Sequence, residues 1–149
     1  MNTLLFPYRA ASWLCLLMIF GSLFTASAAD LKLEVQLVWG TNDEKSPNPS
    51  HTLADPSLAK RLAIFKWKKY YLVQRQEVVV PSRSSKRIPL SKQCEIEIKE
   101  LEGPRIEVNV FGQGKHVLKK TESISKDNVL AIAGDDKNDC AWFIIIKEL

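Results

Sequence analysis

The chain has 149 residues, 26% of them charged, and its 21 lysines and arginines against 17 acidic residues give a formal net charge of +4. A balance so close to neutral gives no reason to expect a nucleic-acid partner, because nucleic-acid-binding proteins usually carry a strong basic patch. The length fits one domain with a short leader before it.

Residues 1–29 are predicted to be a signal peptide. Arg9 is the only charged residue before Asp30, and an uncharged apolar run follows it. The run ends in the sequence ASA at 26–28, which is the A-x-A pattern of a signal-peptidase site. An uncleaved anchor is the alternative, since about 20 uncharged residues can span a bilayer. We expect a single exported domain over residues 30–149, in the periplasm or outside the cell, that does not span the membrane after cleavage.

The elements expected along this domain are almost all strands. Residues 31–39 alternate between apolar and polar side chains, which predicts a half-buried strand. The polar segment Gly40–Thr52 predicts a long loop, and a short helix is expected near residues 56–64. Short strands separated by Gly, Pro, Asn and Asp turns predict a mainly-β fold, an antiparallel β-sandwich or small barrel of about eight strands. The later strands are expected at 66–73, 75–80, 86–90, 93–101, 105–111, 115–121, 128–133 and 140–148.

The segment 65–80, FKWKKYYLVQRQEVVV, changes the parity of its apolar positions along its length. Such a change predicts a bend or bulge near residues 74–76, where the strand could pass between two sheets. The side chains expected to face inward are Trp67 and Tyr71, and those expected to face solvent are Lys66, Lys68 and Tyr70.

The start of this segment is also the first candidate binding surface. Aromatic rings beside cations can bind sugars, lipid headgroups or single strands through stacking and charge. A solvated strand face that protects a sheet edge is the alternative. The candidate binding residues are Lys66, Trp67, Lys68, Lys69, Tyr70, Tyr71 and, in the long loop, His51.

Two cysteines remain after the predicted leader, Cys94 and Cys140. Each alternates with apolar residues that would face a core, in the segments 94–98 and 140–146. An even pair in an oxidising compartment predicts a Cys94–Cys140 disulfide, and two buried free thiols are the alternative.

Patterns for catalysis and metal binding are sparse. Asp135, Asp136 and Asp139 are weak candidates for a hard cation, because their segment lacks the spaced oxygens of an EF-hand loop and could equally form a turn. His51 and His116 are the only histidines, and no Gly-x-Ser-x-Gly stretch or His/Cys cluster occurs. We therefore expect no enzyme activity, no bound metal and no other cofactor.

The leading functional hypothesis is a small exported binding or structural module that recognises another envelope or extracellular protein. The first alternative is a carrier or sensor of a small apolar or anionic ligand. Its cavity would be lined by Trp39, Trp67, Tyr71 and Trp142, with Lys66 or Lys68 at the mouth. The second alternative is a hydrolase or metal-dependent enzyme, which would need His51 or His116 beside a carboxylate.

Overall fold

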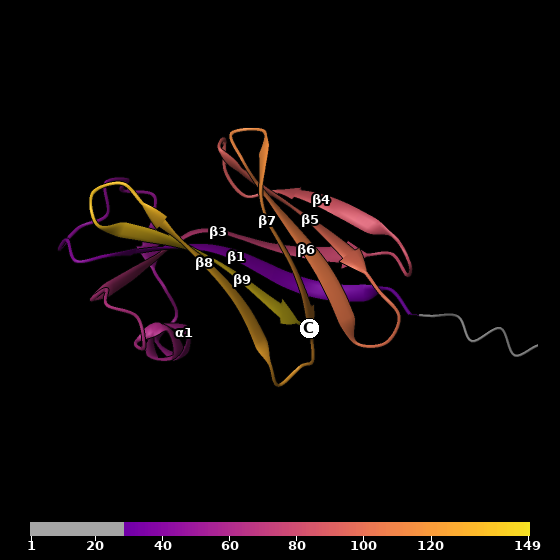
Figure 1. Cartoon of the computed structure of the whole chain (residues 1–149). Helices are drawn as coiled ribbons and strands as arrows, with labels where there is room; N and C mark the ends of the chain where they lie inside the picture. The colour runs from indigo at the N-terminus through magenta and orange to yellow at the C-terminus, as the bar shows by residue number, and fades with distance from the viewer. Residues whose placement is uncertain (1–28) are drawn as a thin grey trace, which may run out of the picture.

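The computed structural model describes residues 29–149, so all but the last residue of the predicted signal peptide lies outside the described residues. Within that range the chain forms nine strands and one short helix, and the strands make two antiparallel sheets (Figure 1). The predicted mainly-β sandwich is confirmed. Over the same residues, the structure contains no helix with the length and apolar character needed to cross a membrane.

Sheet A has five strands in the order β2-β3-β1-β9-β8. The first strand along the chain, β1, lies at its centre, between β3 and β9. Both β1 and β9 carry apolar side chains on both faces, as expected for strands covered on both sides. The bounds are β1 Leu31–Thr41, β2 Thr52–Leu53, β3 Lys69–Val80, β8 Val129–Asp136 and β9 Cys140–Glu148.

Sheet B has four strands in sequence order, β4-β5-β6-β7, and each pairs with the next. The chain enters this sheet from β3 through residues 81–84 and returns to sheet A from β7 through residues 124–128. The bounds are β4 Ser85–Pro89, β5 Cys94–Glu100, β6 Arg105–Gly112 and β7 Lys115–Ser123.

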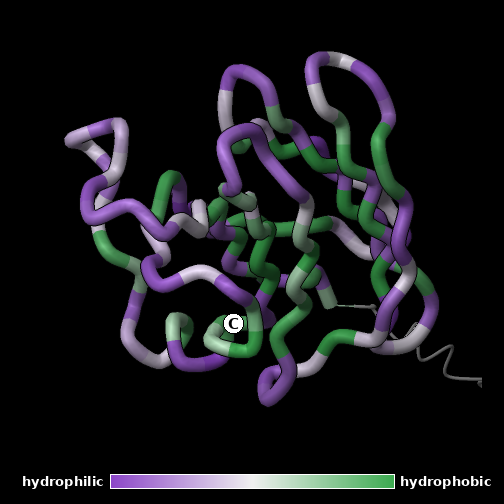
Figure 2. Tube along the Cα trace, turned by 60° about the vertical axis from the view of Figure 1, so that its left-hand side comes forward, coloured by the Kyte–Doolittle hydropathy of each residue, from purple (hydrophilic) through white to green (hydrophobic). Residues whose placement is uncertain are grey.

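The inter-sheet core is formed by the facing sides of the two sheets. It is almost purely aliphatic, and apolar positions follow the strands while hydrophilic residues gather in the connecting loops (Figure 2). Alternation along each strand places every second side chain in this layer. Its fully buried members include Leu33, Val35, Val80, Ile96, Ile98, Ile106, Val108, Ile144 and Ile146.

The helix α1 (Pro56–Leu62) covers the other face of sheet A (Figure 1). The carboxylate of Asp55 caps it by accepting a hydrogen bond from the backbone N–H of Ser57 at 2.9 Å. The Ser57 hydroxyl donates to the same carboxylate at 2.8 Å, and this bond together with the backbone one lowers the pKa of Asp55. The helix buries Leu58 and Leu62 in a second apolar cluster around Phe143. The predicted helix is confirmed and ends two residues earlier than expected.

A β-bulge in β3 explains the change of parity along that strand. The register shifts between the partners of Leu37 and Val38, which leaves Val73 as an extra residue without a partner. The bulge lies one residue before the predicted position at 74–76. The expectation that the strand passes between two sheets there is wrong, because β3 stays paired with β1 on both sides of the bulge. The two strands expected around it are therefore one continuous strand.

Candidate binding cleft

The two sheets diverge toward the end of the sandwich that carries the β6–β7 and β8–β9 hairpins (Figure 1). The space between them is a cleft of about 550 Å³, which we call the end cleft. Most of its lining is apolar, so it continues the inter-sheet core toward solvent. Its lining includes Leu37, Trp39 and Trp142 from sheet A, Val110, Phe111 and Val117 from sheet B, and Pro47 and His51 from the long loop.

The sheet A side of the cleft is a tryptophan pair. Trp39 of β1 lies directly opposite Trp142 of β9 in the antiparallel register, so both indoles project from the same face. Gly134 of β8 is the partner of Trp142 on its other side. A Cβ at Gly134 would come within 2.1 Å of an indole carbon, so only glycine lets the Trp142 ring lie over the β8 backbone. Tyr71 packs against Trp39 with ring centroids 6.4 Å apart.

The sheet B side of the cleft comes from β6 and the start of β7. Val110 and Phe111 of β6 line it, and the register shift between them leaves Val117 of β7 without a partner in β6. The guanidinium of Arg87 lies 4.6 Å from the Phe111 ring centroid. Val117 is 57% exposed, so an aliphatic side chain stands in solvent at the cleft opening.

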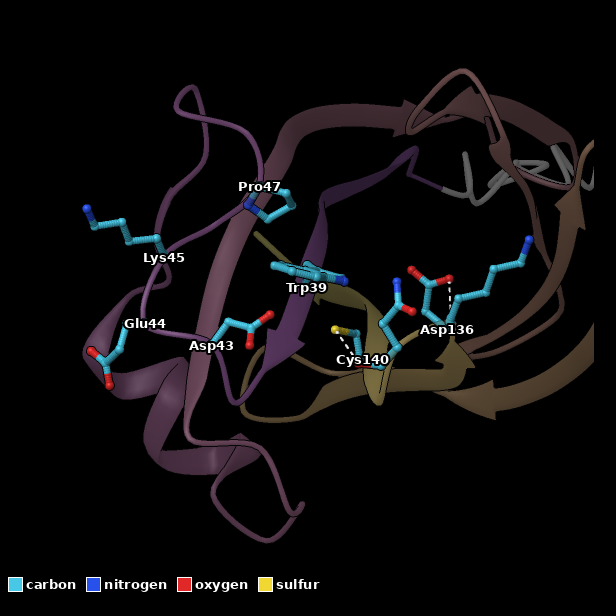
Figure 3. A pocket seen from close by; sticks show the side chains of 9 residues that line it. Trp39, Asp43, Glu44, Lys45, Pro47, Asp136 and Cys140 are labelled. Atoms are coloured by element: carbon cyan, nitrogen blue, oxygen red, sulfur yellow. Dashed lines mark hydrogen bonds between the residues drawn. The ribbon is translucent and has the colours of Figure 1, made fainter.

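A second hollow of about 690 Å³, the rim hollow, adjoins the end cleft and shares Trp39, Pro47 and Asp136 with it (Figure 3). It is richer in charged residues than the end cleft, whose lining contains no Asp, Glu, Lys or Arg besides Asp136. Asp136 is the last residue of β8 and contributes to both spaces. The remaining lining residues of the rim hollow are Asp43, Glu44, Lys45, Lys137, Asn138 and Cys140.

The lysines of the 65–80 segment contact this protein's own loops. Lys66 forms an ion pair with Asp139, which raises the pKa of the lysine, and the Trp67 indole N–H donates to the Asp139 carbonyl at 3.0 Å. The Lys69 ammonium donates to a Glu44 carboxylate oxygen at 2.8 Å. This hydrogen bond raises the pKa of Lys69 and lowers that of Glu44. These contacts fasten the β8–β9 turn and the long loop, and they leave the predicted basic-aromatic surface largely occupied by the protein itself.

The two neighbouring tyrosines have internal roles. Tyr70 is only 5% exposed and its hydroxyl donates to the Leu62 carbonyl at 2.6 Å, and burial raises its pKa. Tyr70 lies on the face opposite Tyr71, as expected, but the expectation that this face meets solvent is wrong, because α1 covers it. Tyr71 is buried as predicted, and its hydroxyl donates to the Glu44 carbonyl at 3.0 Å.

The predicted aromatic cavity is only partly assembled. Trp39, Tyr71 and Trp142 gather on the inter-sheet face of sheet A. Trp67 is half-buried on the opposite face, 5.7 Å from Phe143 between ring centroids. Lys68 is exposed, and its backbone N–H donates to the Asn42 side chain at 3.1 Å. Neither Lys66 nor Lys68 lines either hollow.

The histidines hydrogen-bond neutral side chains. His51 lines the end cleft, with Nδ1 hydrogen-bonded to the Ser46 hydroxyl at 2.8 Å. His116 contacts the Asn109 side-chain oxygen at 3.1 Å and the Phe111 ring. Over residues 29–149, neither ring hydrogen-bonds a carboxylate, and no three His, Cys, Asp or Glu side chains converge as a metal site.

The predicted disulfide is not formed, and Cys94 and Cys140 are free thiols. Cys94 begins β5 in sheet B, whereas Cys140 begins β9 in sheet A, at the end where the sheets diverge. Packed sheets lie roughly 10 Å apart, while a disulfide needs Cα atoms within about 7 Å. The Cys140 sulfur instead lies 3.6 Å from the Thr41 hydroxyl and 3.4 Å from the Asn138 carbonyl. Burial raises the pKa of Cys94.

No protein-family model, curated protein or solved structure matches this chain. What the site can do therefore follows from its own residues. They offer an apolar surface between two sheets, aromatic rings at its opening and carboxylates beside it, a combination suited to binding.

Proposed function

We propose that this protein is a small exported binding module without catalytic activity, and that its end cleft takes up a small, largely apolar ligand. The observation that carries the proposal is the cleft of about 550 Å³ with a tryptophan pair on one side and Val110, Phe111 and Val117 on the other. Sites for small molecules are typically concave, mostly apolar and roughly 300–1,000 Å³ in volume. This geometry moves the carrier or sensor hypothesis ahead of the protein-partner hypothesis.

The partial exposure of the apolar side chains in the cleft supports the binding of an apolar ligand there. Deeper between the sheets, aliphatic side chains such as Leu33 and Ile146 are fully buried. At the open end Trp39 and Trp142 are only half-buried, and Val117 is exposed. Covering these side chains with an apolar ligand would remove their surface from water, at about 25 cal/mol per Å² of apolar area.

Export is the second part of the proposal. Its support is the apolar run after Arg9 and the small-residue pattern at 26–28. After export, the protein would act in the periplasm or in the extracellular space. The mass of the protein secreted by its own host tests it, since cleavage near residue 29 removes the whole leader.

The cleft is tested with 1-decanol as a neutral apolar probe, using ¹⁵N-labelled protein starting at residue 29. The indole N–H signals of Trp39 and Trp142 should shift with a saturable dependence on probe concentration. The signal of Trp67, on the far face of sheet A, serves as an internal control and should stay in place.

A matched pair of variants locates the binding. Val117→Trp should block the cleft opening and weaken binding at least several-fold, because position 117 lines the cleft and is exposed. Val79→Trp adds the same ring at an exposed position of β3 that does not line the cleft, and should bind like the unmodified protein. Equal shifts of all three indoles, or equal binding by both variants, would contradict the proposal.

A protein partner remains a second candidate, and the free edge of β8 favours it. Residues 129–134 of this edge strand, VLAIAG, contain no charge and no proline, the usual features that prevent a further strand from pairing. The partner would be another envelope or extracellular protein. Loss of its association in Ala133→Lys, with decanol binding unchanged, would establish this second role.

A further inference from the structure

We propose that the ligand of the end cleft carries a positively charged head, an alkylammonium group, which binds in the rim hollow between Trp39 and the carboxylates of Asp43 and Asp136. This inference rests on the proposed function, because the apolar body of the same ligand occupies the adjoining end cleft. The ligand class is thus a cationic amphiphile.

Asp136 is a carboxylate at a position where the strand otherwise places apolar residues. Along β8 the side chains of Leu130 and Ile132 belong to the inter-sheet core, and the period of two puts Asp136 on the same face. Among the residues that line the end cleft, it is the only one with a formal charge at neutral pH. A carboxylate in such a place suits a cationic group at the end of an apolar body.

The acidic residues of this region differ in their partners. Glu44 and Asp139 are already paired, with Lys69 and Lys66 respectively. Asp43 and Asp136 form no ion pair with any residue in 29–149. Asp136 accepts one hydrogen bond, from the backbone N–H of Lys137 at 2.7 Å, and retains further acceptor capacity. Two carboxylates therefore remain available to a ligand.

Trp39 supplies an aromatic surface between these carboxylates. Asp43 and Asp136 lie on opposite sides of its ring, whereas the Lys45 side chain extends away from it (Figure 3). A tryptophan face attracts ammonium groups through its quadrupole, and quaternary ammonium ions are often held by aromatic rings in this way. The arrangement therefore combines a cation–π surface with two anionic groups.

The sign of the charge differs from the expected anionic ligand. That expectation placed Lys66 or Lys68 at the mouth, but neither lines the cleft or the rim hollow. Lys45 and Lys137 do line the rim hollow and oppose a cation. Removing their charge should therefore strengthen the binding of a cation.

The test compares three probes that share a decyl tail: decyltrimethylammonium, 1-decanol and decyl sulfate, each below its micelle concentration. The cation should bind roughly tenfold more tightly than the alcohol, and the sulfate more weakly than the alcohol. The difference between cation and alcohol should shrink as ionic strength rises. Affinities are read from the Trp39 and Trp142 indole signals.

Variants assign the preference to named groups. Asp136→Asn and Asp43→Asn should each lower the affinity for the cation several-fold and leave that for decanol unchanged. Lys137→Gln should raise the affinity for the cation. Asp127→Asn, which removes a carboxylate that lines neither hollow, is the matched control and should change nothing.

The outcomes separate the two proposals. If none of the probes binds, the cleft is not a ligand site and the proposed function fails. If all three bind equally, the cleft stands and the cationic head is refuted. Tighter binding of decyl sulfate would overturn the inference and restore an anionic ligand.

Discussion

The two ends of the sandwich differ although they are built from the same strands. At one end the chain crosses between the sheets twice, through 81–84 and 124–128, and the inter-sheet side chains near it, such as Leu33, Val80 and Ile146, are fully buried. At the other end every connection stays within one sheet, and no disulfide joins the sheets. The closed end is thus tied together by the backbone, whereas the open end can hold a cleft. The topology decides where the site lies.

The largest expected loss of stability comes from truncating a core side chain near the closed end. Ile146→Ala removes a fully buried side chain from the inter-sheet core and should lower the free energy of unfolding by about 2–5 kcal/mol. Trp142→Leu, at the half-buried open end, should cost less stability but abolish the binding of decanol. Urea unfolding of both variants checks the comparison. A greater loss of stability in Trp142→Leu would mean that the open end is packed as firmly as the closed one.

A smaller effect is expected from a methyl group at the open end. Gly134→Ala forces the Trp142 ring to move, since the new Cβ would lie 2.1 Å from it, and should cost about 1–3 kcal/mol. In a Trp142→Leu background the same substitution should cost clearly less. Thermal unfolding of the double-mutant cycle provides the measurement, and strict additivity would show that the two residues do not interact.

Tyr70 and Tyr71 make hydrogen bonds to different parts of the molecule, the first to the helix α1 and the second to the long loop. Tyr70→Phe removes a buried hydrogen bond to Leu62 and should cost about 0.5–1.5 kcal/mol. Tyr71→Phe releases the carbonyl of Glu44, so it should change global stability less and speed amide exchange in residues 42–51. The reverse pattern would contradict these assignments.

A weaker effect is expected from pH on the mobility of the long loop at the open end. The hydrogen bond from Lys69 lowers the pKa of Glu44 below its ordinary value of 4.5. The stabilisation of the long loop by the Lys69–Glu44 contact is therefore complete above pH 4.5. It is lost as the pH falls through the lowered folded-state pKa of Glu44. Amide exchange in residues 42–51 should rise in that acid range. Lys69→Gln should already show the faster exchange at neutral pH and lose this pH dependence.

Reduction should have no effect at all. Because Cys94 and Cys140 are free, strong reductant should leave the melting temperature unchanged. Denatured, unreduced protein starting at residue 29 should contain two titratable thiols per chain. A fall of several degrees on reduction would instead show a bridge across the open end.

The strands and the helix could be predicted from the sequence to within about three residues, because alternation and turn residues mark them directly. Two local features could not. The strand β2 has only two residues, too few to show a period. The sequence predicts the correct face of β3 for Tyr70, but it does not show that α1 packs on that face and buries it.

The site was less accessible to sequence reasoning. Trp39 and Trp142 stood out as large aromatics, and Asp136 as part of an acidic segment. Phe111 and Val117 carry no local signal, since only the packing of one sheet on the other brings them to the end cleft. Asp43 carries none either, because the fold of the long loop beside β1 and the β8–β9 turn places it in the rim hollow. Lys66 and Lys69 were predicted as ligand-binding residues because they lie among aromatic residues. Their partners in the structure, Asp139 and Glu44, lie far away in the chain and could not be inferred.

The central place of β1 in sheet A governs the order in which the molecule can assemble. Its neighbour β9 is the last strand of the chain, so sheet A stays incomplete until residues 140–148 are available. Contacts between such distant segments slow folding, because a long loop must close before they form. A chain that crosses a membrane with its N-terminus first would therefore remain unfolded during passage, and would acquire its sandwich only after its final residues had emerged.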